Sequence, residues 1–339
     1  MIPVSVLTGF LGSGKTTLLG RLLMAPEFAR TAVIINEFGE IGLDHDLVTA
    51  SSESLIELAT GCLCCAVRGD LAETLNDLLA RRDGGLVPPF ERIVIETSGL
   101  ADPAPILQLL MTDRGLAARL ALSGVITTVD AVTGLATLDR EPEAEKQAAV
   151  ADRLILTKSD LAGGVSDDLT RRLRELNPSA PRLEVSFGNV DPTLLFDGNP
   201  YALDSKSADV ARWLGDPEGQ AKRHTERSAP AARGITCFSL IRDAPLPAVA
   251  LTLFLETLAE HCGADLLRMK GILNLAEWPD RPAVIHGVQH VFHPPALLDR
   301  WPSPDRRSRL VFIARGVPQS WVEALMTALE AEVADRAAD

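Results

Sequence analysis

Residues 4–23 read VSVLTGFLGSGKTTLLGRLL, an apolar run followed by a glycine-rich loop and then by a helix-forming segment. Residues 9–16 match the pattern G-x-x-x-x-G-K-T, which is informative only between a strand and a helix. Glycines let the backbone curl so that its N–H groups point at phosphate oxygens, and the start of a helix adds a favourable dipole. The stretch therefore predicts a phosphate-binding loop, and a chance glycine-rich turn is the alternative.

The residue types of this loop suggest their roles. We expect Lys15 to reach the β- and γ-phosphates of a bound nucleotide and to act in catalysis, because it neutralises the transferring phosphoryl group. The Thr16 hydroxyl is expected to ligate Mg²⁺. The remaining expected nucleotide contacts are Gly9, Gly12, Ser13, Gly14 and Thr17.

Strands and helices alternate over the first ~200 residues, which predicts an α/β fold of the P-loop NTPase type with a doubly wound, mainly parallel sheet. Near-continuous apolar runs predict strands buried on both faces at 4–8, 32–36, 92–96, 124–129 and 153–157. Helices are expected at 15–23, 70–80 and 105–110.

The pattern then changes to that of a smaller α+β domain. Residues 215–224 are polar and have no periodic apolar face, which is typical of a linker. We expect a first domain at 1–205, a linker at 206–233 and a C-terminal domain at 234–335. Its expected strands are 235–241, 266–275, 283–293 and 309–314, with a helix at 247–261 and a final helix carrying an apolar stripe from Val322 to Val333.

The tetrapeptide Thr157-Lys158-Ser159-Asp160 follows a predicted strand and indicates a guanine site. The Asp160 carboxylate can accept from N1–H and N2–H₂ of guanine, whereas adenine offers neither donor, so GTP should be preferred over ATP. The stem of Lys158 can cover the base. Thr157 stands where many GTPases have asparagine, and it lacks the amide that supports the base loop, so we expect a lower affinity. A solvated turn is the alternative.

The run Glu96-Thr97-Ser98-Gly99 closes another buried strand near the phosphate loop. A carboxylate at this place manages Mg²⁺ and the γ-phosphate, and Gly99 lets the backbone approach the γ-phosphate and move when it leaves. Glu96 and Gly99 are therefore expected catalytic residues. Glu96 could contact Mg²⁺ through water or orient the attacking water, and a helix-capping turn is the alternative.

Three of the five cysteines, Cys62, Cys64 and Cys65, lie within four residues. They are too crowded for a disulfide framework, but their thiolates suit Zn²⁺ or Cu⁺, with Co²⁺ as a further candidate. Three protein ligands leave a fourth position for Glu37, His45, water or a partner protein. Glu37 lies in Asn36-Glu37-Phe38-Gly39-Glu40, a loop that can close over the γ-phosphate. A redox pair or inert thiols are the alternatives.

The chain carries 46 acidic and 33 basic residues, a net charge of −13, which argues against binding to nucleic acid. No apolar run reaches the ~18 residues that span a bilayer, and the first residues lack a basic leader, so we expect a cytoplasmic protein without a membrane partner.

Cys237 and Cys262 lie on apolar faces and are expected in the core. In the strand expected at 283–293, His286 and His290 share a face, and structural roles are favoured for the histidines.

Together with the phosphate loop, the segments NEFGE, GCLCC, ETSGLADP, TKSD and LRMKGIL (267–273) resemble the CobW-type metallochaperone GTPases, relatives of the urease- and hydrogenase-maturation GTPases. The resemblance covers nearly the whole chain. It implies Mg-dependent GTP hydrolysis coupled to binding a transition metal, zinc or cobalt, and to its delivery to a client metalloprotein. Many members have a histidine-rich tract between the domains, whereas this chain has only His224 there, which puts metal storage in doubt.

Three functions remain open at this stage. The first is the GTPase metallochaperone, with metal affinity coupled to the GTP or GDP state. The second is a metal-responsive nucleotide-binding regulatory protein without productive turnover. The third is a P-loop small-molecule kinase, which would prefer ATP. The identity of the client, the physiological metal and the formation of a homodimer are not specified by the sequence.

Overall fold

The computed structural model describes residues 1–36, 55–57, 63–67, 70–196 and 234–338. Two compact units divide the chain, and each is described by itself. The first comprises Met1–Thr170 and Pro181–Asn199, and the second Arg171–Ala180 and Pro200–Asp339. The domain boundaries expected from the sequence stay a prediction, and the expected linker at 206–233 lies outside the described residues.

The described strands of the first unit form an eight-stranded sheet in the order β3-β4-β2-β5-β1-β6-β7-β8. All neighbouring pairs are parallel except β3 and β4, which are antiparallel. The five expected strands are present, which confirms the predicted fold class. The strands are β1 (Ile2–Gly9), β2 (Thr31–Asn36), β3 (Leu55–Glu57), β4 (Leu63–Val67), β5 (Arg92–Thr97), β6 (Leu120–Asp130), β7 (Arg153–Thr157) and β8 (Arg182–Val185).

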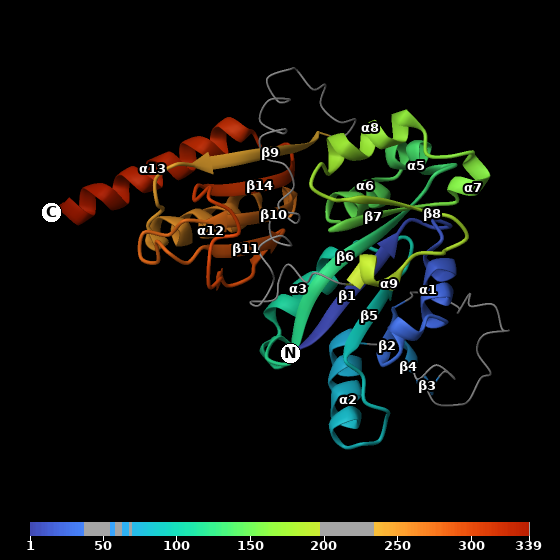
Figure 1. The fold of residues 1–339 in the computed structure, drawn as a ribbon. Coiled ribbons are helices and arrows are strands. Elements are labelled where there is room, and N and C mark those ends of the chain that lie inside the picture. The colour runs from blue at the N-terminus through green and yellow to red at the C-terminus, as the bar shows by residue number, and fades with distance from the viewer. Residues whose placement is uncertain (37–54, 58–62, 68–69, 197–233, 339) are drawn as a thin grey trace. The chain divides into compact units, whose positions relative to one another are not determined.

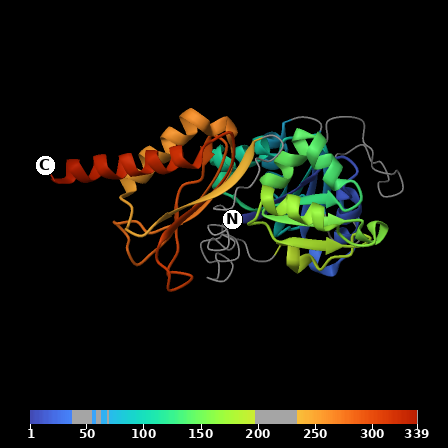
Figure 2. The same ribbon diagram turned by 90° about the horizontal axis from the view of Figure 1, so that it is seen from above.

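Helices cover both faces of this sheet (Figures 1 and 2). The connection from β1 to β2 crosses the sheet in one direction, whereas those from β5 to β6 and from β6 to β7 cross in the other. Right-handed crossovers therefore place α1 on one face and α3, α4 and α6 on the opposite face. The helices are α1 (Lys15–Leu23), η1 (Pro26–Phe28), α2 (Leu71–Asp83), α3 (Ala104–Thr112), α4 (Arg114–Ala117), α5 (Gly134–Arg140), α6 (Pro142–Ala149), α7 (Ser159–Ala162), α8 (Asp167–Leu176) and α9 (Pro192–Phe196).

The apolar residues of α1 explain why it packs on the sheet. Leu18, Leu19 and Leu22 recur at helical spacing, are at most 3% exposed, and share a core with η1, α9 and the strands. This packing holds the first turn of α1 at the carboxyl end of β1. The carboxyl ends of β5, β6 and β7 meet at the same edge of the parallel sheet, where ligands of doubly wound folds bind.

The second unit has an antiparallel sheet in the order β12-β11-β10-β14-β9, with β13 paired to β11. Two helices cover one face, where Phe254, Val322 and Met326 join the core, as the stripe on the final helix predicts. The elements are β9 (Ile235–Arg242), α12 (Ala248–Cys262), η2 (Gly263–Asp265), β10 (Leu266–Leu273), β11 (Ala283–Val288), β12 (Val291–Phe292), β13 (Ala296–Leu297), β14 (Ser308–Arg315) and α13 (Gln319–Ala338). Among the described residues, none of the helices combines the length and apolarity that crossing a bilayer requires.

One expected strand of this unit is wrong. Residues 283–293 form a hairpin rather than one strand, because the chain turns at Gln289, whose φ is 54°. The turn brings the rings of His286 and His293 into a stack with centroids 4.7 Å apart. His290 instead lies at the turn, with Nδ1 2.9 Å from the Ala259 carbonyl oxygen. The pairing of His286 with His290 on one strand face is therefore also wrong.

Candidate functional site

The glycine-rich loop joins β1 to α1 and has the backbone that the motif requires. Gly14 precedes α1 with a φ of 91°, a left-handed conformation that favours glycine. At Gly9 a Cβ would collide with the Thr128 side chain on β6, so glycine is needed for close approach. The Lys15 ammonium donates to the carbonyl oxygens of Gly9 and Phe10 over 2.8 and 3.3 Å. The lysine thus folds back over the loop that is expected to hold phosphate.

Thr16 and Glu96 come from different elements and meet at the sheet edge. The Thr16 hydroxyl donates to Glu96 Oε1 over 3.3 Å. Glu96 is 5% exposed and pairs in register with Leu7 of β1 and Ile35 of β2, so it belongs to the centre of the sheet. A buried carboxylate beside a hydroxyl gives two oxygen donors of the type that Mg²⁺ prefers.

The turn after β5 carries Gly99 close to the glycine-rich loop. The Ser98 amide donates to the carbonyl oxygen of Asn36 over 3.0 Å, which ties the turn to the end of β2. A Cβ on Gly99 would lie 2.8 Å from the Leu11 amide nitrogen. Only glycine allows this approach of the two loops, whereas the expected approach of Gly99 to a γ-phosphate stays a prediction.

The base loop is attached to the phosphate loop through Thr157. Its hydroxyl donates to the Ser13 carbonyl oxygen over 2.6 Å, and Thr157 is 5% exposed. The Thr157 hydroxyl therefore supports the base loop where an amide is absent, and the lower affinity expected from the sequence stays a prediction. A Cβ on Gly14 would lie 3.4 Å from the Thr157 side chain, so the two loops are also packed together.

Lys158 is held by an acid that the sequence motifs did not include. Its ammonium lies 2.7 Å from Oδ2 of Asp130, the last residue of β6. Burial raises the pKa of Asp130, but hydrogen bonds from Lys158 and from the N–H groups of Val132 and Thr133 outweigh it and leave the pKa below its ordinary value. Lys158 has a φ of 57°, and Asp160, two residues on, is exposed at the start of α7.

A second segment beside the base loop was missed at the sequence level. The Ser159 and Ser186 hydroxyls lie 3.0 Å apart, which places the turn after β8 against the TKSD segment. At Gly188, whose φ is 72°, a Cβ would lie 3.0 Å from the Thr17 carbonyl oxygen. Phe187 between them is 68% exposed. A serine two residues before a glycine, after a weakly apolar strand, is the signal that the sequence offers for this turn.

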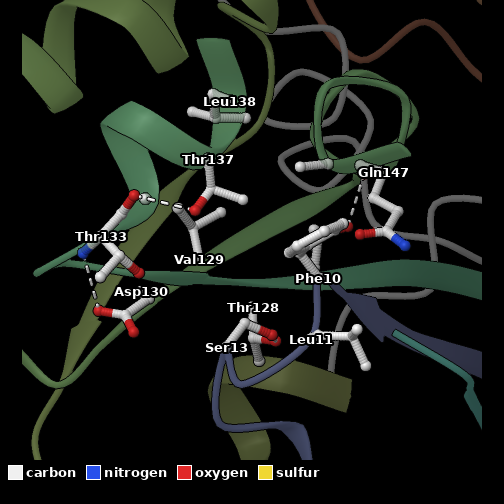
Figure 3. A pocket seen from close by; sticks show the side chains of 13 residues that line it. Phe10, Leu11, Ser13, Thr128, Val129, Asp130, Thr133, Thr137, Leu138 and Gln147 are labelled. Carbon is white, nitrogen blue, oxygen red and sulfur yellow. Dashed lines mark hydrogen bonds between the residues drawn. The ribbon is translucent and has the colours of Figure 1, made fainter. Parts of the chain in front are cut away.

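A pocket lies beside the glycine-rich loop, on the side of β6, α5 and α6 (Figure 3). Phe10 and Leu11 of the loop form one wall, and Thr133 and Thr137 of the α5 region form another. Ser13 lies at its base with its hydroxyl 2.6 Å from that of Thr128. The pocket thus borders the loop expected to hold phosphate.

The expected metal ligands lie largely outside the described residues, as Cys62, Glu37 and His45 do. The backbone of Cys64 and Cys65 belongs to β4, in register with Val33 and Ile34 of β2. Within the described ranges, no group of three or more His, Cys, Asp or Glu residues is arranged to hold a metal ion.

The other two cysteines are free and have raised pKa values. Burial raises the pKa of the Cys237 thiol to about 12, and burial also raises that of Cys262. Cys237 is 4% exposed, and Cys262 packs at the edge of the core of the second unit. Both therefore behave as packed apolar residues, as expected.

Comparison with known proteins agrees with this geometry. Residues 3–184 match the CobW/HypB/UreG nucleotide-binding domain, and residues 235–330 match the cobalamin synthesis protein cobW C-terminal domain. The chain belongs to the CobW/HypB/UreG family. It is 34% identical over 329 residues to the zinc chaperone YjiA of Escherichia coli, covering 97% of this chain and 98% of that protein. It is 32% identical over 367 residues to the zinc chaperone CobW of Pseudomonas aeruginosa, covering 97% and 92%.

Solved structures of the family match nearly the whole chain. The crystal structure of Zn(II)-bound YjiA GTPase from E. coli matches with a TM-score of 0.74 and 32% identity, over 97% of this chain and 98% of that one. A Zn(II)-bound triple mutant of YjiA, in which one glutamate and two neighbouring cysteines are replaced by alanine, matches with a TM-score of 0.76. Both similarities support the two-part fold described above.

Proposed function

We propose that this chain is a GTPase that binds a transition metal, zinc before cobalt, and delivers it to a client metalloprotein. GTP hydrolysis transfers the γ-phosphoryl group to water and releases GDP and phosphate. The observation that carries the proposed nucleotide site is the hydrogen bond from the Thr157 hydroxyl to the Ser13 carbonyl oxygen, while the preference for guanine rests on Asp160. This hydrogen bond joins the base loop to the phosphate loop, so one nucleotide can engage both. The names of the relatives, zinc chaperones and a YjiA GTPase, support the same activity.

Each part of the nucleotide has a proposed partner. Lys15 takes the β- and γ-phosphates and neutralises charge as the phosphoryl group transfers. Asp160 accepts from guanine, and the stem of Lys158 covers the base. Thr16 ligates Mg²⁺ directly, and the 3.3 Å contact to Glu96 fits a carboxylate that binds the same ion or the attacking water. The ion would supply positive charge that offsets the negative charge of the phosphate oxygens.

The metal cargo is assigned to the cysteine segment. Cys62, Cys64 and Cys65 supply thiolates, and Glu37 is the proposed fourth ligand, with His45 as the alternative. Glu37 directly follows β2, whose last residue, Asn36, accepts from the Ser98 amide of the turn that carries Gly99. A change at the γ-phosphate can therefore reach the metal ligands through two adjacent loops.

The experiment is steady-state hydrolysis of GTP and of ATP by the purified chain, with and without Zn²⁺ or Co²⁺, alongside metal analysis. Metal-dependent GTP turnover and bound zinc are expected. Turnover that ignores metal would favour the regulatory protein, and preference for ATP would favour the kinase. Cys64→Ala should lose bound zinc, whereas the matched variant Cys262→Ala should keep it. Because the YjiA triple mutant is itself described as Zn(II)-bound, zinc is counted per chain in each variant.

We also propose that the chain can form a homodimer. Light scattering of the chain with GDP and with a non-hydrolysable GTP analogue tests it. A mass that doubles only with the analogue would support a nucleotide-dependent dimer, and one mass in both states would exclude that dependence.

A further inference from the structure

Two consecutive residues of α6, Lys146 and Gln147, hold the segment that follows β5. The Gln147 side-chain amide donates to the carbonyl oxygens of Gly99 and Ala101 over 3.2 and 3.0 Å. The Lys146 ammonium donates to Asp102 Oδ2 over 3.1 Å. We propose that Gln147, assisted by Lys146, is a positioning residue for GTP hydrolysis. In this role it holds the 99–102 segment so that Gly99 meets the γ-phosphate, and the inference rests on the proposed function.

The two carbonyl contacts determine the conformation of the segment. A trans peptide is planar, with its C=O and N–H pointing in opposite directions. Holding the Gly99 and Ala101 oxygens on α6 therefore sets the planes of the Gly99–Leu100 and Ala101–Asp102 peptides and turns the N–H groups of Leu100 and Asp102 away from the Gln147 amide. Leu100 itself is 56% exposed, so its side chain contributes little to holding the segment. The clamp acts on the backbone.

Gln147 is well placed to act as a rigid support. It is fully buried, and its backbone oxygen accepts from the buried Thr127 hydroxyl of β6 over 2.8 Å. Thr127 is the β6 residue in register with Thr8 of β1, next to Gly9. The same strand pair therefore anchors both the phosphate loop and the residue that holds the 99–102 segment.

In making these contacts, the Gln147 side chain leaves its own amide oxygen, Oε1, without a partner among the described residues, although the residue is buried. Figure 3 shows the amide among the residues that line the pocket, with its oxygen toward Phe10. An apolar side chain of the same length would avoid that cost. Such a side chain would lack the two N–H donors that the Gln147 amide directs at the backbone carbonyl oxygens.

Lys146 fixes the far end of the same segment. Asp102, its partner, also accepts from the Ala104 amide at the start of α3 over 2.9 Å. The ion pair is partly buried, with side-chain exposures of 25% for Lys146 and 29% for Asp102. The segment is thus held at its beginning, its middle and its end, and Gly99 lies close to Leu11 of the glycine-rich loop.

The test uses variants that keep the size of the side chain. Gln147→Met removes the donors, and Gln147→Glu turns a carboxylate toward two carbonyl oxygens. Glu143→Gln, the reverse change on the same helix, is the matched control. For both Gln147 variants, we expect kcat for GTP to fall about tenfold or more, because a displacement of ~1 Å can cost up to about a hundredfold in rate. The affinity for GDP should change less than twofold, since GDP lacks the γ-phosphate.

A second readout distinguishes positioning from a merely structural role. Hydrogen exchange of the amides in 99–102 should quicken in both Gln147 variants and in Lys146→Met, while exchange in β1 and α1 stays unchanged. Wild-type kcat in folded Gln147→Met, or an equal loss of GDP and GTP-analogue affinity, would overturn the proposal. If the Gln147 variants do not fold, Lys146→Met decides: unchanged exchange and unchanged kcat would contradict it. Absence of GTP turnover in the wild type would instead refute the proposed function.

Discussion

The hydroxyl of Thr157 donates to the carbonyl oxygen of Ser13 over 2.6 Å and so joins the end of β7 to the phosphate loop. The two residues are 144 positions apart, and both are buried. The contact holds the base loop against the phosphate loop. Pre-organisation of this kind reduces the ordering cost of binding.

Removing that hydroxyl should weaken nucleotide binding. Thr157→Val keeps the shape but leaves the buried Ser13 oxygen without this donor, which costs about 1 kcal/mol or roughly fivefold in affinity. Titration of GDP by calorimetry measures it, with Thr157→Ser as the control that keeps a hydroxyl. Equal affinities in the wild type and the valine variant would show that the contact does not support the site.

Base selectivity should depend on Asp160. Asp160→Asn replaces an acceptor by an amide that can donate to the C2 carbonyl of xanthine, so preference for GTP over ATP should erode and affinity for xanthine nucleotides should rise. Competition between GTP, ATP and XTP for a fluorescent GDP analogue provides the measurement. If discrimination between GTP and ATP is unchanged in this variant, the TKSD segment is not part of the base site.

Variants of Lys15 and Glu96 should distinguish residues needed for GTP hydrolysis from residues needed for Mg-GTP binding. Lys15→Ala is expected to abolish hydrolysis, because the Lys15 ammonium lies on the glycine-rich loop that we propose to hold the phosphates. Glu96→Gln should slow turnover while leaving Mg-GTP binding largely intact, which single-turnover kinetics and analogue titration measure. Loss of Mg-GTP binding in Glu96→Gln would instead assign the carboxylate to the ion.

The ion pair between Lys158 and Asp130 should persist down to acid pH. The pKa of Asp130 lies below its ordinary value of 3.8, so the folded state favours the carboxylate and gains stability above that pH. The gain is lost as pH falls through the folded pKa, and none of it changes between pH 5 and 8. Asp130→Asn should lower GTP affinity by less than tenfold, because partly exposed ion pairs contribute about 1 kcal/mol or less. The measurement is the ratio of GTP affinities of the wild type and Asp130→Asn at several pH values. A ratio that changes between pH 5 and pH 8 would contradict this prediction.

The central strands could be predicted from the sequence because strands buried on both faces are apolar throughout. The glycine-rich loop and TKSD could be recognised because their residues follow predicted strands in a characteristic order and spacing. β8 was missed because it is a sheet-edge strand whose residues 182–184 are not fully buried, so its apolar pattern is weak. The hairpin at Gln289 was hidden because a non-glycine residue adopts the left-handed turn.

Contacts between distant segments lay beyond the sequence patterns. The acid that holds Lys158 is 28 positions away, and the amide that holds Gly99 is 48 positions away. Neither Asp130 nor Gln147 belongs to a recognisable motif. The pairing of β6 with β7 brings Asp130 to the site, and the packing of α6 on β6 brings Gln147 there. The same holds for Thr157, for which the residue type alone suggested a loss of support.

The coupling of metal to nucleotide is the central claim, and zinc affinity in three nucleotide states tests it most directly. A competing chromophoric chelator measures Zn²⁺ affinity of the nucleotide-free, GDP-bound and GTP-analogue-bound chain, at constant pH because thiolates must lose protons to bind. The account predicts tighter binding with the analogue, by ~5–150-fold, and the same factor for GTP affinity when zinc is bound. Cys64→Ala should lose the tight site, and Cys262→Ala should not. Equal zinc affinity in all three states would contradict the coupling, even in a chain that binds zinc and hydrolyses GTP.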